Sequence, residues 1–574
     1  MNTGLQTALR NLEQWSLEIG LKLSHSITKY MIFSKTKQDN PKDFILHNSP
    51  IEYVDNMKFL GMIFDNKLNW KSHIMYLKKS CQRSLDLMKT IASKDWGADT
   101  TILLNIYGTL IRSRLDYGAI VYNTAKDTVL RNLDVIQNNA LRIALGAFCT
   151  SPITSLQCLA GEPYLTSRRQ YLTLQYAFSV ASNPTNPVHF NTIANRFKNT
   201  FQRNPRTDLP LYGRVNRYLS DSGISIPANT NLINPPSPPW LISPPECDTS
   251  LTFLKKSERN TQTISKTFHH HLLTYAGYTC NYTDASKTEE GTGAAFTTDN
   301  HQVIFKLPET ATVFTGELYA VWRAMQFANE ENIERCLIIT DSLSSLSALP
   351  ELYPSHPILI SIKHELRRIS NNGINLRLLW VPSHCGIIGN ERADLLAKRA
   401  ITEGEITALP AIIPSDMKVF LKHLQNKSRQ FEWDTSNSKL HEVKKSICPY
   451  KSIPNNRKHQ VVLTRLRLGH TRITHDYLST RSTEPVCYLC DTTLTVKHIL
   501  WIAKCYPLGA SRRLASDDLC FVAQFPIASI SKAFFALKTL SFTAPLENFL
   551  VPKVLSGGIS FETLAVSEVL SAMA

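Results

Sequence analysis

The amino-acid sequence predicts an α/β domain over residues 275–402, in which a mixed sheet is covered by helices. Two observations lead to this fold class. Short apolar runs joined by brief turns first follow one another directly, and later runs then alternate with amphipathic segments of helical period. A meander followed by strand–helix alternation is typical of a mixed sheet with helices packed on it. The predicted strands are 280–286, 293–299, 302–307, 335–341 and 375–383.

Helices are predicted between and after these strands. The segment 314–330 places Leu318, Val321, Trp322 and Met325 on one stripe, which suits a helix that buries a single face. The pattern as a whole predicts helices packed on the sheet. The other helices of the domain are predicted at 342–349, 357–370 and 389–400.

The rest of the chain divides into three regions by composition. Residues 1–175 mix predicted helices with an apolar strand at 58–65 that ends in a turn. Residues 183–250 are rich in proline, which disfavours regular helix, so we predict a semi-rigid linker there. Residues 403–574 are predicted to form a mostly helical tail. Helices of the first region are expected within 5–23, where the helical spacing breaks at Gly20, and at 101–120 and 131–146.

Length and charge limit the classes of function. A chain of 574 residues predicts about three or four domains, and 43% hydrophobic residues exclude wholesale disorder. The formal net charge is +16 and the isoelectric point is about 9.2. This excess of positive charge favours a polyanionic partner, above all nucleic acid, whereas a basic protein without such a partner is the alternative.

No feature of the sequence predicts secretion or a membrane span. The N-terminal residues lack an apolar signal segment, and no run of about 18 apolar residues occurs. The 12 cysteines are scattered, which is unlike a disulfide scaffold. We therefore expect an intracellular protein that binds no membrane, with nucleus and cytoplasm both open.

Four acidic residues lie where the loops of such a domain converge. Asp284 and Asp341 are predicted to end the first and fourth strands, while Glu317 lies in the first turn of the first helix. Asp394 lies one turn into the last helix. Gathered carboxylates repel one another unless cations neutralise them, and hard oxygen ligands suit Mg²⁺ or Mn²⁺. Such a cluster suits phosphodiester hydrolysis with two metal ions; the alternative is that each acid is a cap satisfied by backbone N–H groups.

The segments around these acids strongly resemble the ribonuclease H (RNase H) domain of LINE-type, non-LTR retrotransposon polyproteins. The resemblance implies an RNase H-like five-stranded mixed sheet with flanking helices. It also implies endonucleolytic hydrolysis of the RNA strand of RNA–DNA hybrids. The segments that carry the resemblance are YTDAS (282–286), TGELYAV (315–321), IITDSLSSL (338–346) and WVPSHCGIIGNERADLLAK (380–398).

The resemblance further implies roles for individual residues. Asp284, Glu317, Asp341 and Asp394 would hold two Mg²⁺ ions, for which Mn²⁺ can substitute. His384, on a loop next to glycine, would assist proton transfer or product release, as suits an imidazole that titrates near neutral pH.

Polar residues beside the acids are candidate contacts to the sugar–phosphate backbone of a hybrid. Recognition of a hybrid would depend on its A-like shape and its 2′-hydroxyl groups. No nucleotide cofactor is expected, and the oligomeric state stays open. The candidate contact residues are Ser286, Thr315, Ser342 and Asn390.

Two positions depart from the usual pattern of the family. Ala285 follows the first aspartate where the family commonly has glycine, and Gly316 precedes the glutamate where alanine is common. Both positions keep a small residue and neither change removes a ligand. Glycine can nevertheless weaken the start of a helix by up to about 1 kcal/mol.

The N-terminal region resembles the part of the same polyproteins that follows the reverse-transcriptase palm. The first 175 residues contain neither a Y-x-D-D turn nor any adjacent pair of aspartates. We therefore predict a truncated remnant of late palm, thumb and connection segments, without reverse transcriptase activity. The resembling segments are KFLGMIFDNKLNWKSHI (58–74), IYGTLIRSRLDYGAIVY (106–122) and LDVIQNNALRIALGAF (133–148).

The tail holds a Cys/His motif with the spacing C-x2-C-x7-H-x6-C, which suits a tetrahedral structural zinc site. The motif resembles the C-terminal Cys/His motif of the same retrotransposons, in which the gap before the last cysteine is usually shorter. Two interpretations stay open, a Cys₃His zinc site and an unmetallated remnant. The residues are Cys487, Cys490, His498 and Cys505.

These features predict a Mg²⁺-dependent ribonuclease H in a retrotransposon-derived chain, with RNA–DNA hybrids as its substrate. The alternative from another class is a non-catalytic relic that binds nucleic acid through its basic surface. An assay of hybrid cleavage with and without Mg²⁺ separates the two.

Overall fold

The structure is a computed structural model that describes residues 2–34, 43–93, 96–193, 210–226, 238, 242, 244–253, 261–450, 454–487 and 491–499. The chain forms two compact units, each with its own hydrophobic core. Residues 1–172 and 426–574 belong to the first, here named the N-terminal unit. Residues 173–425 form the second, here named the sheet unit.

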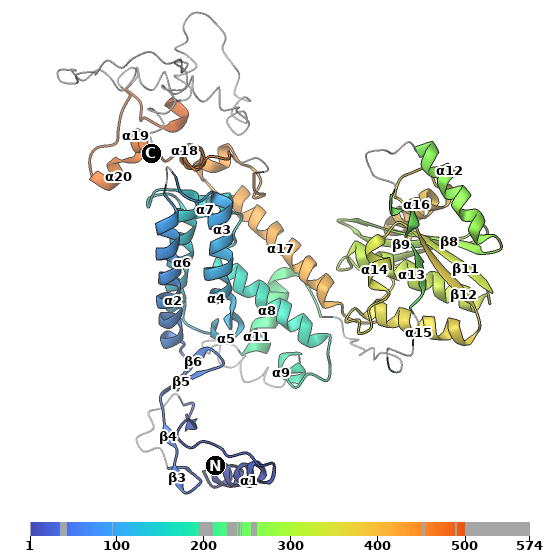
Figure 1. Cartoon of the computed structure of the whole chain (residues 1–574). Helices are drawn as coiled ribbons and strands as arrows, with labels where there is room; N and C mark the ends of the chain where they lie inside the picture. Colours follow the sequence, from blue (N-terminus) through green and yellow to red (C-terminus); the bar gives the residue numbers. More distant parts are fainter. Residues whose placement is uncertain are drawn as a thin grey trace, which may run out of the picture. The chain divides into compact units, whose positions relative to one another are not determined.

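The sheet unit is built on a six-stranded mixed sheet with the order β10-β9-β8-β11-β12-β7 (Figure 1). Strands β8, β9 and β10 form an antiparallel meander, and β11, β12 and β7 run parallel to β8. This arrangement confirms the predicted α/β class with a mixed sheet. The strands are β7 (Glu246–Asp248), β8 (Thr279–Thr288), β9 (Gly291–Thr297), β10 (Gln302–Leu307), β11 (Arg335–Thr340) and β12 (Asn375–Trp380).

The sheet has one strand more than the five predicted. Strand β7 comes from the proline-rich segment expected to be a linker, and it pairs in parallel with β12 from Glu246 beside Arg377 to Asp248 beside Leu379. The same segment also contains helix α11 (Leu211–Ser222). Strand β7 covers the backbone edge of β12, and this contact depends on residues far apart in sequence, which local composition does not reveal.

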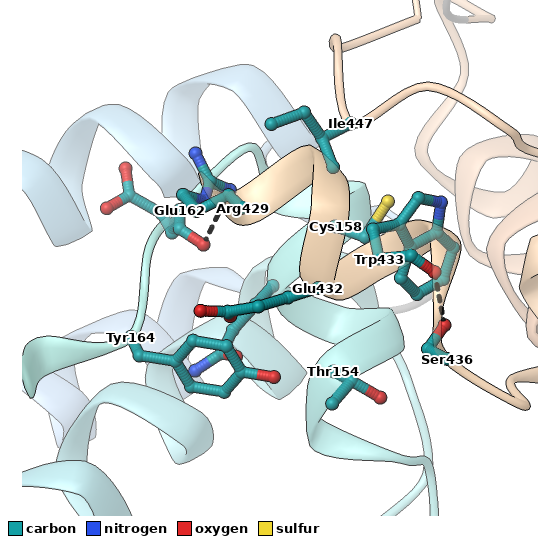
Figure 2. Close-up of a pocket in the computed structure, with 10 residues that line it drawn as sticks. Thr154, Cys158, Glu162, Tyr164, Arg429, Glu432, Trp433, Ser436 and Ile447 are labelled. Atoms are coloured by element: carbon teal, nitrogen blue, oxygen red, sulfur yellow. Dashed lines mark hydrogen bonds between the residues drawn. The ribbon is translucent and has the colours of Figure 1, made fainter. Parts of the chain in front are cut away.

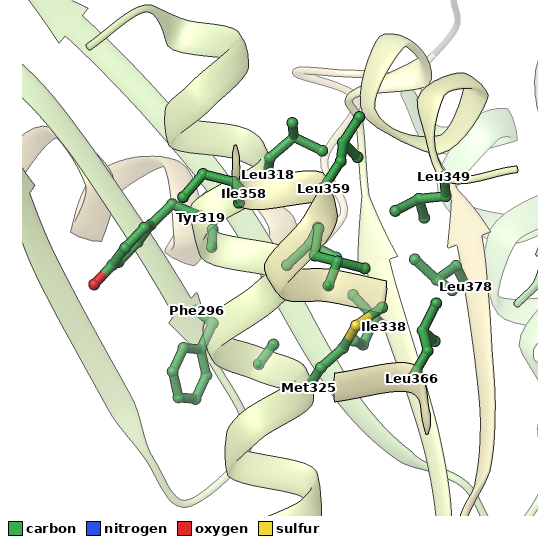
Figure 3. Close-up of a cluster of buried hydrophobic side chains, with 14 of the residues drawn as sticks. Phe296, Leu318, Tyr319, Met325, Ile338, Leu349, Ile358, Leu359, Leu366 and Leu378 are labelled. Carbon is green, nitrogen blue, oxygen red and sulfur yellow. The ribbon is translucent and has the colours of Figure 1, made fainter. Parts of the chain in front are cut away.

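Helices cover both faces of the sheet. Along β11, Ile338 enters one core with α13, α14 and α15, whereas Leu337 and Ile339 enter a core on the opposite face with α12. Figure 3 shows the first of these cores, with Met325 of α13 close to Ile338. These helices are α12 (Thr261–Leu272), α13 (Val313–Glu330), α14 (Leu343–Ala348) and α15 (Pro357–Asn371).

Helix α16 (Ile388–Glu403) lies close against the strands β8 and β9 because two glycines leave room for it. A Cβ atom at Gly293 would overlap the carbonyl oxygen of Ala397, and one at Gly389 would overlap the ring of Tyr282. The close approach brings Asp394 of α16 near the strand that carries Asp284.

The N-terminal unit is mostly helical. Its core lies among α2, α3 and α6, where Trp70, Tyr107 and Tyr122 are buried. Short strands pair as β1 with β4, β2 with β3, and β5 with β6. The elements up to residue 160 are α1 (Asn2–Glu18), β1 (Lys29–Tyr30), β2 (Ile45–Leu46), β3 (Ser49–Pro50), β4 (Glu52–Tyr53), β5 (Asn56–Phe59), β6 (Met62–Asp65), α2 (Lys71–Ile91), α3 (Thr100–Ile106), η1 (Tyr107–Arg112), α4 (Ser113–Asp116), α5 (Ala119–Tyr122), α6 (Asp127–Leu145) and α7 (Ile153–Ala160).

The segment 58–65 belongs to a hairpin and is not the single strand that we predicted. Phe59 of β5 pairs with Met62 of β6, so Leu60 and Gly61 form a two-residue turn. Both turn residues have positive φ, +45° and +80°, as the tight hairpin turns that match strand twist require. The glycine in the middle of the apolar run makes the turn.

The described part of the tail is helical, as predicted, and part of it completes the N-terminal unit. Arg457 of α18 donates hydrogen bonds to Thr100 Oγ1 at 3.0 Å and to the carbonyl oxygen of Ala144 at 2.7 Å. Gln460 Oε1 accepts from the backbone N–H of Thr100 at 2.8 Å. The remaining elements are α8 (Leu165–Ala181), α9 (His189–Ile193), η3 (Ser250–Phe253), η5 (Leu273–Tyr275), α17 (Pro414–Asp434), η6 (Lys439–Glu442), α18 (Arg457–Leu468), α19 (Arg472–His475) and α20 (Tyr477–Thr480).

Within the described residues, every helix is too short or too polar to span a lipid bilayer.

Candidate active site

Three of the four predicted acids form one cluster in the sheet unit. Asp284 comes from β8, Glu317 from α13, and Asp341 directly follows β11. One carboxylate oxygen of each lies within 4.8 Å of the others. Asp284 and Glu317 are each only 6% exposed. The cluster therefore combines residues from two neighbouring strands and one helix in a partly buried position.

The register of the sheet explains why Asp284 and Asp341 meet. Contrary to our prediction, Asp284 does not end its strand, because β8 continues to Thr288 by pairing with β9. Strand β11 stops earlier, and its last pair with β8 joins Thr340 to Thr283. Asp341 thus leaves the sheet beside Asp284. Glu317 lies one residue beyond the first turn of α13, which begins at Val313.

Burial and mutual repulsion disfavour the ionised form of all three carboxyl groups in the cluster. Burial raises the pKa of Asp284 to about 7, and the charges of Asp341 and Asp394 add to this effect, although the N–H of Ala285 opposes it at 2.7 Å. Burial, together with Asp284 and Asp341, raises the pKa of Glu317 well above its usual value. Burial also raises the pKa of Asp341, against a hydrogen bond from Asn390 and the charge of His384. A bound cation would relieve this repulsion.

The donor set fits a hard divalent cation. Within the described part of the chain, Glu317 Oε2 is buried without a hydrogen-bond partner. An unpaired buried carboxylate oxygen is costly, and a metal ion is one of the few groups that can satisfy it. Carboxylate oxygens are the ligands that Mg²⁺ and Mn²⁺ prefer.

Asp394 belongs to a second group, with His384 and Glu391, whose ligand atoms also lie within 4.8 Å of one another. Its carboxylate accepts from Lys398 Nζ at 2.7 Å. The charge of Asp394 acts on both Asp284 and Asp341, so the two groups are neighbours. Asp284, Glu317 and Asp341 therefore form one group and Asp394 lies in a neighbouring group, whereas we expected a single set of four.

Glu391 is a residue of this site that the sequence analysis did not identify. Its Oε1 accepts from the backbone N–H of Gly386 at 3.2 Å and so ties α16 to the loop that carries His384. His384 is exposed and adopts a left-handed φ of +53° in that loop. The spacing of three residues between Glu391 and Asp394 places both on one helix face, which is the signal that could have found Glu391.

Two of the four predicted nucleic-acid contacts are buried in the protein. Thr315 is 0% exposed and its hydroxyl lies 3.1 Å from His356 Nε2, so this residue of α13 faces the inside of the unit. Asn390 is 3% exposed, and its side chain donates to Asp341. Ser286 and Ser342 are half-buried at the surface, and Ser342 caps α14 by accepting from the N–H of Ser345.

The predicted zinc ligands are only partly covered by the structure. Cys490 and Cys505 lie outside the described residues. Cys487 is buried, and its N–H donates to the carbonyl oxygen of Thr492 at 2.8 Å. The hydroxyl of Thr492 lies 3.5 Å from His498 Nδ1. Cys487 and His498 therefore both lie next to Thr492, and the zinc site stays a prediction.

A hollow in the N-terminal unit lies between α7 and the end of α17 (Figure 2). Arg429 Nη2 donates to the carbonyl oxygen of Glu162 at 3.0 Å, and the carboxylate of Glu162 pairs with Arg112. Ser436 donates to the carbonyl oxygen of Trp433 at 2.7 Å. The contact of Arg429 with Glu162 joins two distant segments of the unit, and we assign the hollow a structural role.

Comparison with known proteins identifies the class of the sheet unit. Residues 277–402 match the RNase H family. The match includes the three clustered acids, Asp394 and the His384 loop. Residues 277–402 are therefore an RNase H domain, as the sequence analysis predicted.

The wider chain is homologous to proteins of Drosophila non-LTR retrotransposons. It is 22% identical over 214 residues to the RNA-directed DNA polymerase from mobile element jockey of Drosophila funebris, which covers 37% of this chain and 23% of that protein. It is 27% identical over 168 residues to the putative 115 kDa protein in type-1 retrotransposable element R1DM of Drosophila melanogaster, with 29% and 16% covered. Human ribonuclease H1 is 27% identical over 112 residues, with 17% and 39% covered. The matched stretches thus span less than a quarter of either retrotransposon protein.

Proposed function

We propose that the sheet unit hydrolyses the RNA strand of RNA–DNA hybrids with the help of two divalent cations, Mg²⁺ or Mn²⁺. The observation that carries this proposal is the cluster of Asp284, Glu317 and Asp341, in which Glu317 Oε2 is buried without a partner. These three carboxylates would hold the ions, together with the neighbouring Asp394. When bound, the ions lower the pKa of water and stabilise the leaving oxygen of a phosphodiester.

The side chains around the acids have separate tasks in this proposal. Asn390 donates to Asp341 and so keeps its carboxylate turned toward the cluster. His384 takes up or releases a proton at a ring nitrogen near the phosphate, because it is exposed and next to Asp394. Glu391 holds the loop of His384 through Gly386.

Selectivity for a hybrid would come from its shape and its 2′-hydroxyl groups, because the groups beside the acids are polar side chains suited to contacts with sugar and phosphate. Ser286 and Ser342 stay as proposed contacts to the sugar–phosphate backbone, since both reach the surface beside the acids. We propose that the chain has no reverse transcriptase activity of its own, because residues 1–175 hold no adjacent aspartates.

Replacement of Asp341 by asparagine tests the proposal. The change keeps the size of the side chain but removes a charge and weakens a metal ligand. Cleavage of a hybrid in Mg²⁺ should fall by at least about 10³-fold, or about 4 kcal/mol of barrier. Without metal, the variant should be more stable than the wild type because one of the repelling charges is gone. Mg²⁺ should then raise its melting temperature less than that of the wild type.

The matched control is Asp299→Asn, which removes an exposed acid from the turn after β9. It should leave both cleavage and the effect of Mg²⁺ unchanged. An Asp341→Asn protein that cuts hybrids at the wild-type rate would show that Asp341 does not hold a catalytic ion. A chain that binds hybrids but cuts none at any Mg²⁺ concentration would instead support the non-catalytic relic.

A further inference from the structure

Asp416 lies outside the matched domain, yet it contacts the helix that carries Glu317. It sits in the first turn of α17 and is 3% exposed. Its Oδ2 accepts from the backbone N–H of Thr312 at 3.1 Å, and its Oδ1 accepts from the Thr312 hydroxyl at 2.9 Å. A buried carboxylate with both oxygens bound to one residue is a specific contact and not a solvated surface charge.

Thr312 is the N-cap residue of α13, and its hydroxyl accepts from the N–H of Thr315 at 3.3 Å. In a capping box, a glutamate at the third helical position accepts from the N–H of the N-cap residue. In α13 that third position is Thr315, which has no carboxylate. Asp416 supplies the missing acceptor from another helix, and its negative charge suits the positive end of the α13 dipole.

The segment that precedes Asp416 is built into the sheet unit. Ile406 forms a parallel bridge with Lys306 of the edge strand β10, and the N–H of Thr407 donates to the carbonyl oxygen of Lys306 at 2.7 Å. Ile413 is 3% exposed and belongs to the same core as Leu318 of α13. The position of Asp416 is therefore fixed by the sheet and the core.

From these contacts we infer that Asp416 is a positioning residue for the active site, and that residues 404–425 belong to the folded unit that holds the acids. Glu317 lies one turn after Thr312, so the first turn of α13 sets where its carboxylate meets Asp284 and Asp341. Asp416 fixes that turn. This role in catalysis rests on the proposed function, whereas the effect on α13 itself does not.

The test compares Asp416→Ala and Asp416→Asn in the full chain. With alanine, kcat for hybrid cleavage should fall about 10- to 100-fold, because misplacement of a catalytic group by about 1 Å has effects of this size. KM for the hybrid should be unchanged, and the Mg²⁺ concentration for half-maximal rate should rise severalfold. Asparagine keeps one acceptor oxygen and should lie between alanine and wild type.

Hydrogen exchange of the amides of Thr315, Gly316 and Glu317 gives a readout that does not need activity. Exchange there should become faster in Asp416→Ala. The control is Met417→Ala, which removes a side chain of 6% exposure from the next position and keeps the Asp416 carboxylate. It should lower stability yet keep kcat, the Mg²⁺ dependence and the α13 exchange pattern.

The outcomes separate the two proposals. A wild-type chain that does not cut hybrids contradicts the proposed function, while the α13 exchange still tests the contact with Asp416. Unchanged exchange in Asp416→Ala would overturn the inference. An active chain in which Asp416→Ala keeps the wild-type kcat and Mg²⁺ dependence would also overturn it. The same losses in Met417→Ala would do so as well, because the effect would then be one of general packing.

Discussion

Replacement of Gly316 by alanine introduces a methyl group between α13 and β8 where the structure has no room for it. The added Cβ would lie 2.8 Å from the Cβ of Ala285 and 3.0 Å from Cγ2 of Thr292. Carbon atoms prefer separations of about 3.5–4.0 Å, so the helix or the strand has to move by several tenths of an ångström. Asp284 precedes Ala285 and Glu317 follows Gly316, so the shift would reach both acids.

The size of the effect follows from two opposing contributions. Overpacking a well-filled core typically costs about 1–3 kcal/mol. Alanine regains at most about 1 kcal/mol over glycine in a helix. We therefore expect Gly316→Ala to lower the free energy of unfolding of the sheet unit by about 1–2 kcal/mol and to reduce hybrid cleavage.

The double variant Ala285→Gly with Gly316→Ala restores the pattern that is common in the family. It moves the methyl group from the strand to the helix across the same contact, so its stability should return close to that of the wild type. The expected coupling energy is about 1–3 kcal/mol, as for residues in direct contact.

The assay is hydrogen exchange on peptides from β8 and α13, which reports the opening of this unit separately from the rest of the chain. Gly4→Ala is the control, since a Cβ at Gly4 in α1 meets no atom within 4 Å. A single Gly316→Ala variant as stable as the wild type would refute the reasoning. A double variant no more stable than that single variant would do the same.

Further expectations concern pH, zinc and polymerisation. The pKa of Asp284 is about 7 in the folded chain, above the ordinary value of 3.8, so folding favours its protonated form. In EDTA the free energy of unfolding of the sheet unit should therefore fall by at most about 4 kcal/mol as the pH rises from about 4 to above 7. The melting temperature should fall with it, and saturating Mg²⁺ should reduce this dependence on pH. If the Cys/His motif binds metal, the purified chain carries about one zinc; Cys490→Ser should then remove the zinc, unfold the tail locally and leave hybrid cleavage intact, and metal analysis of the two proteins decides. The purified chain should extend no primer on RNA or DNA templates, and template-dependent incorporation of labelled nucleotides would contradict this.

The elements of the RNase H domain could be predicted because their pattern is local. The alternation of strands and helices and the small and acidic residues near 284, 317 and 341 are visible in short windows of sequence. The pairing of strands that are far apart in sequence is not visible in such windows. Asp284 lies in mid-strand because β8 pairs onward with β9, and β7 joins the sheet only because β12 has an edge to cover.

The contacts between elements were also beyond sequence reasoning. Ala285 and Gly316 read as two separate departures from a family pattern, whereas the structure places them against each other, so that they compensate. Thr315 was predicted to touch substrate because of its neighbours in sequence, yet the packing of α13 buries it. Asp416 gave no signal, since its partner Thr312 is 104 positions away.

The N-terminal unit is built from two segments far apart in the chain, so it can be completed only late in synthesis. Thr100 binds Arg457, which lies 357 positions later in the chain. At about 5–20 residues per second, a ribosome needs about 20–70 s to add that stretch. During this interval the end of α6 lacks its contact with α18, whose Val461 packs against Gly146 in the complete chain. The sheet unit, made entirely in between, can finish folding first, so nascent-chain chaperones would meet the N-terminal unit as the late-maturing half of the protein.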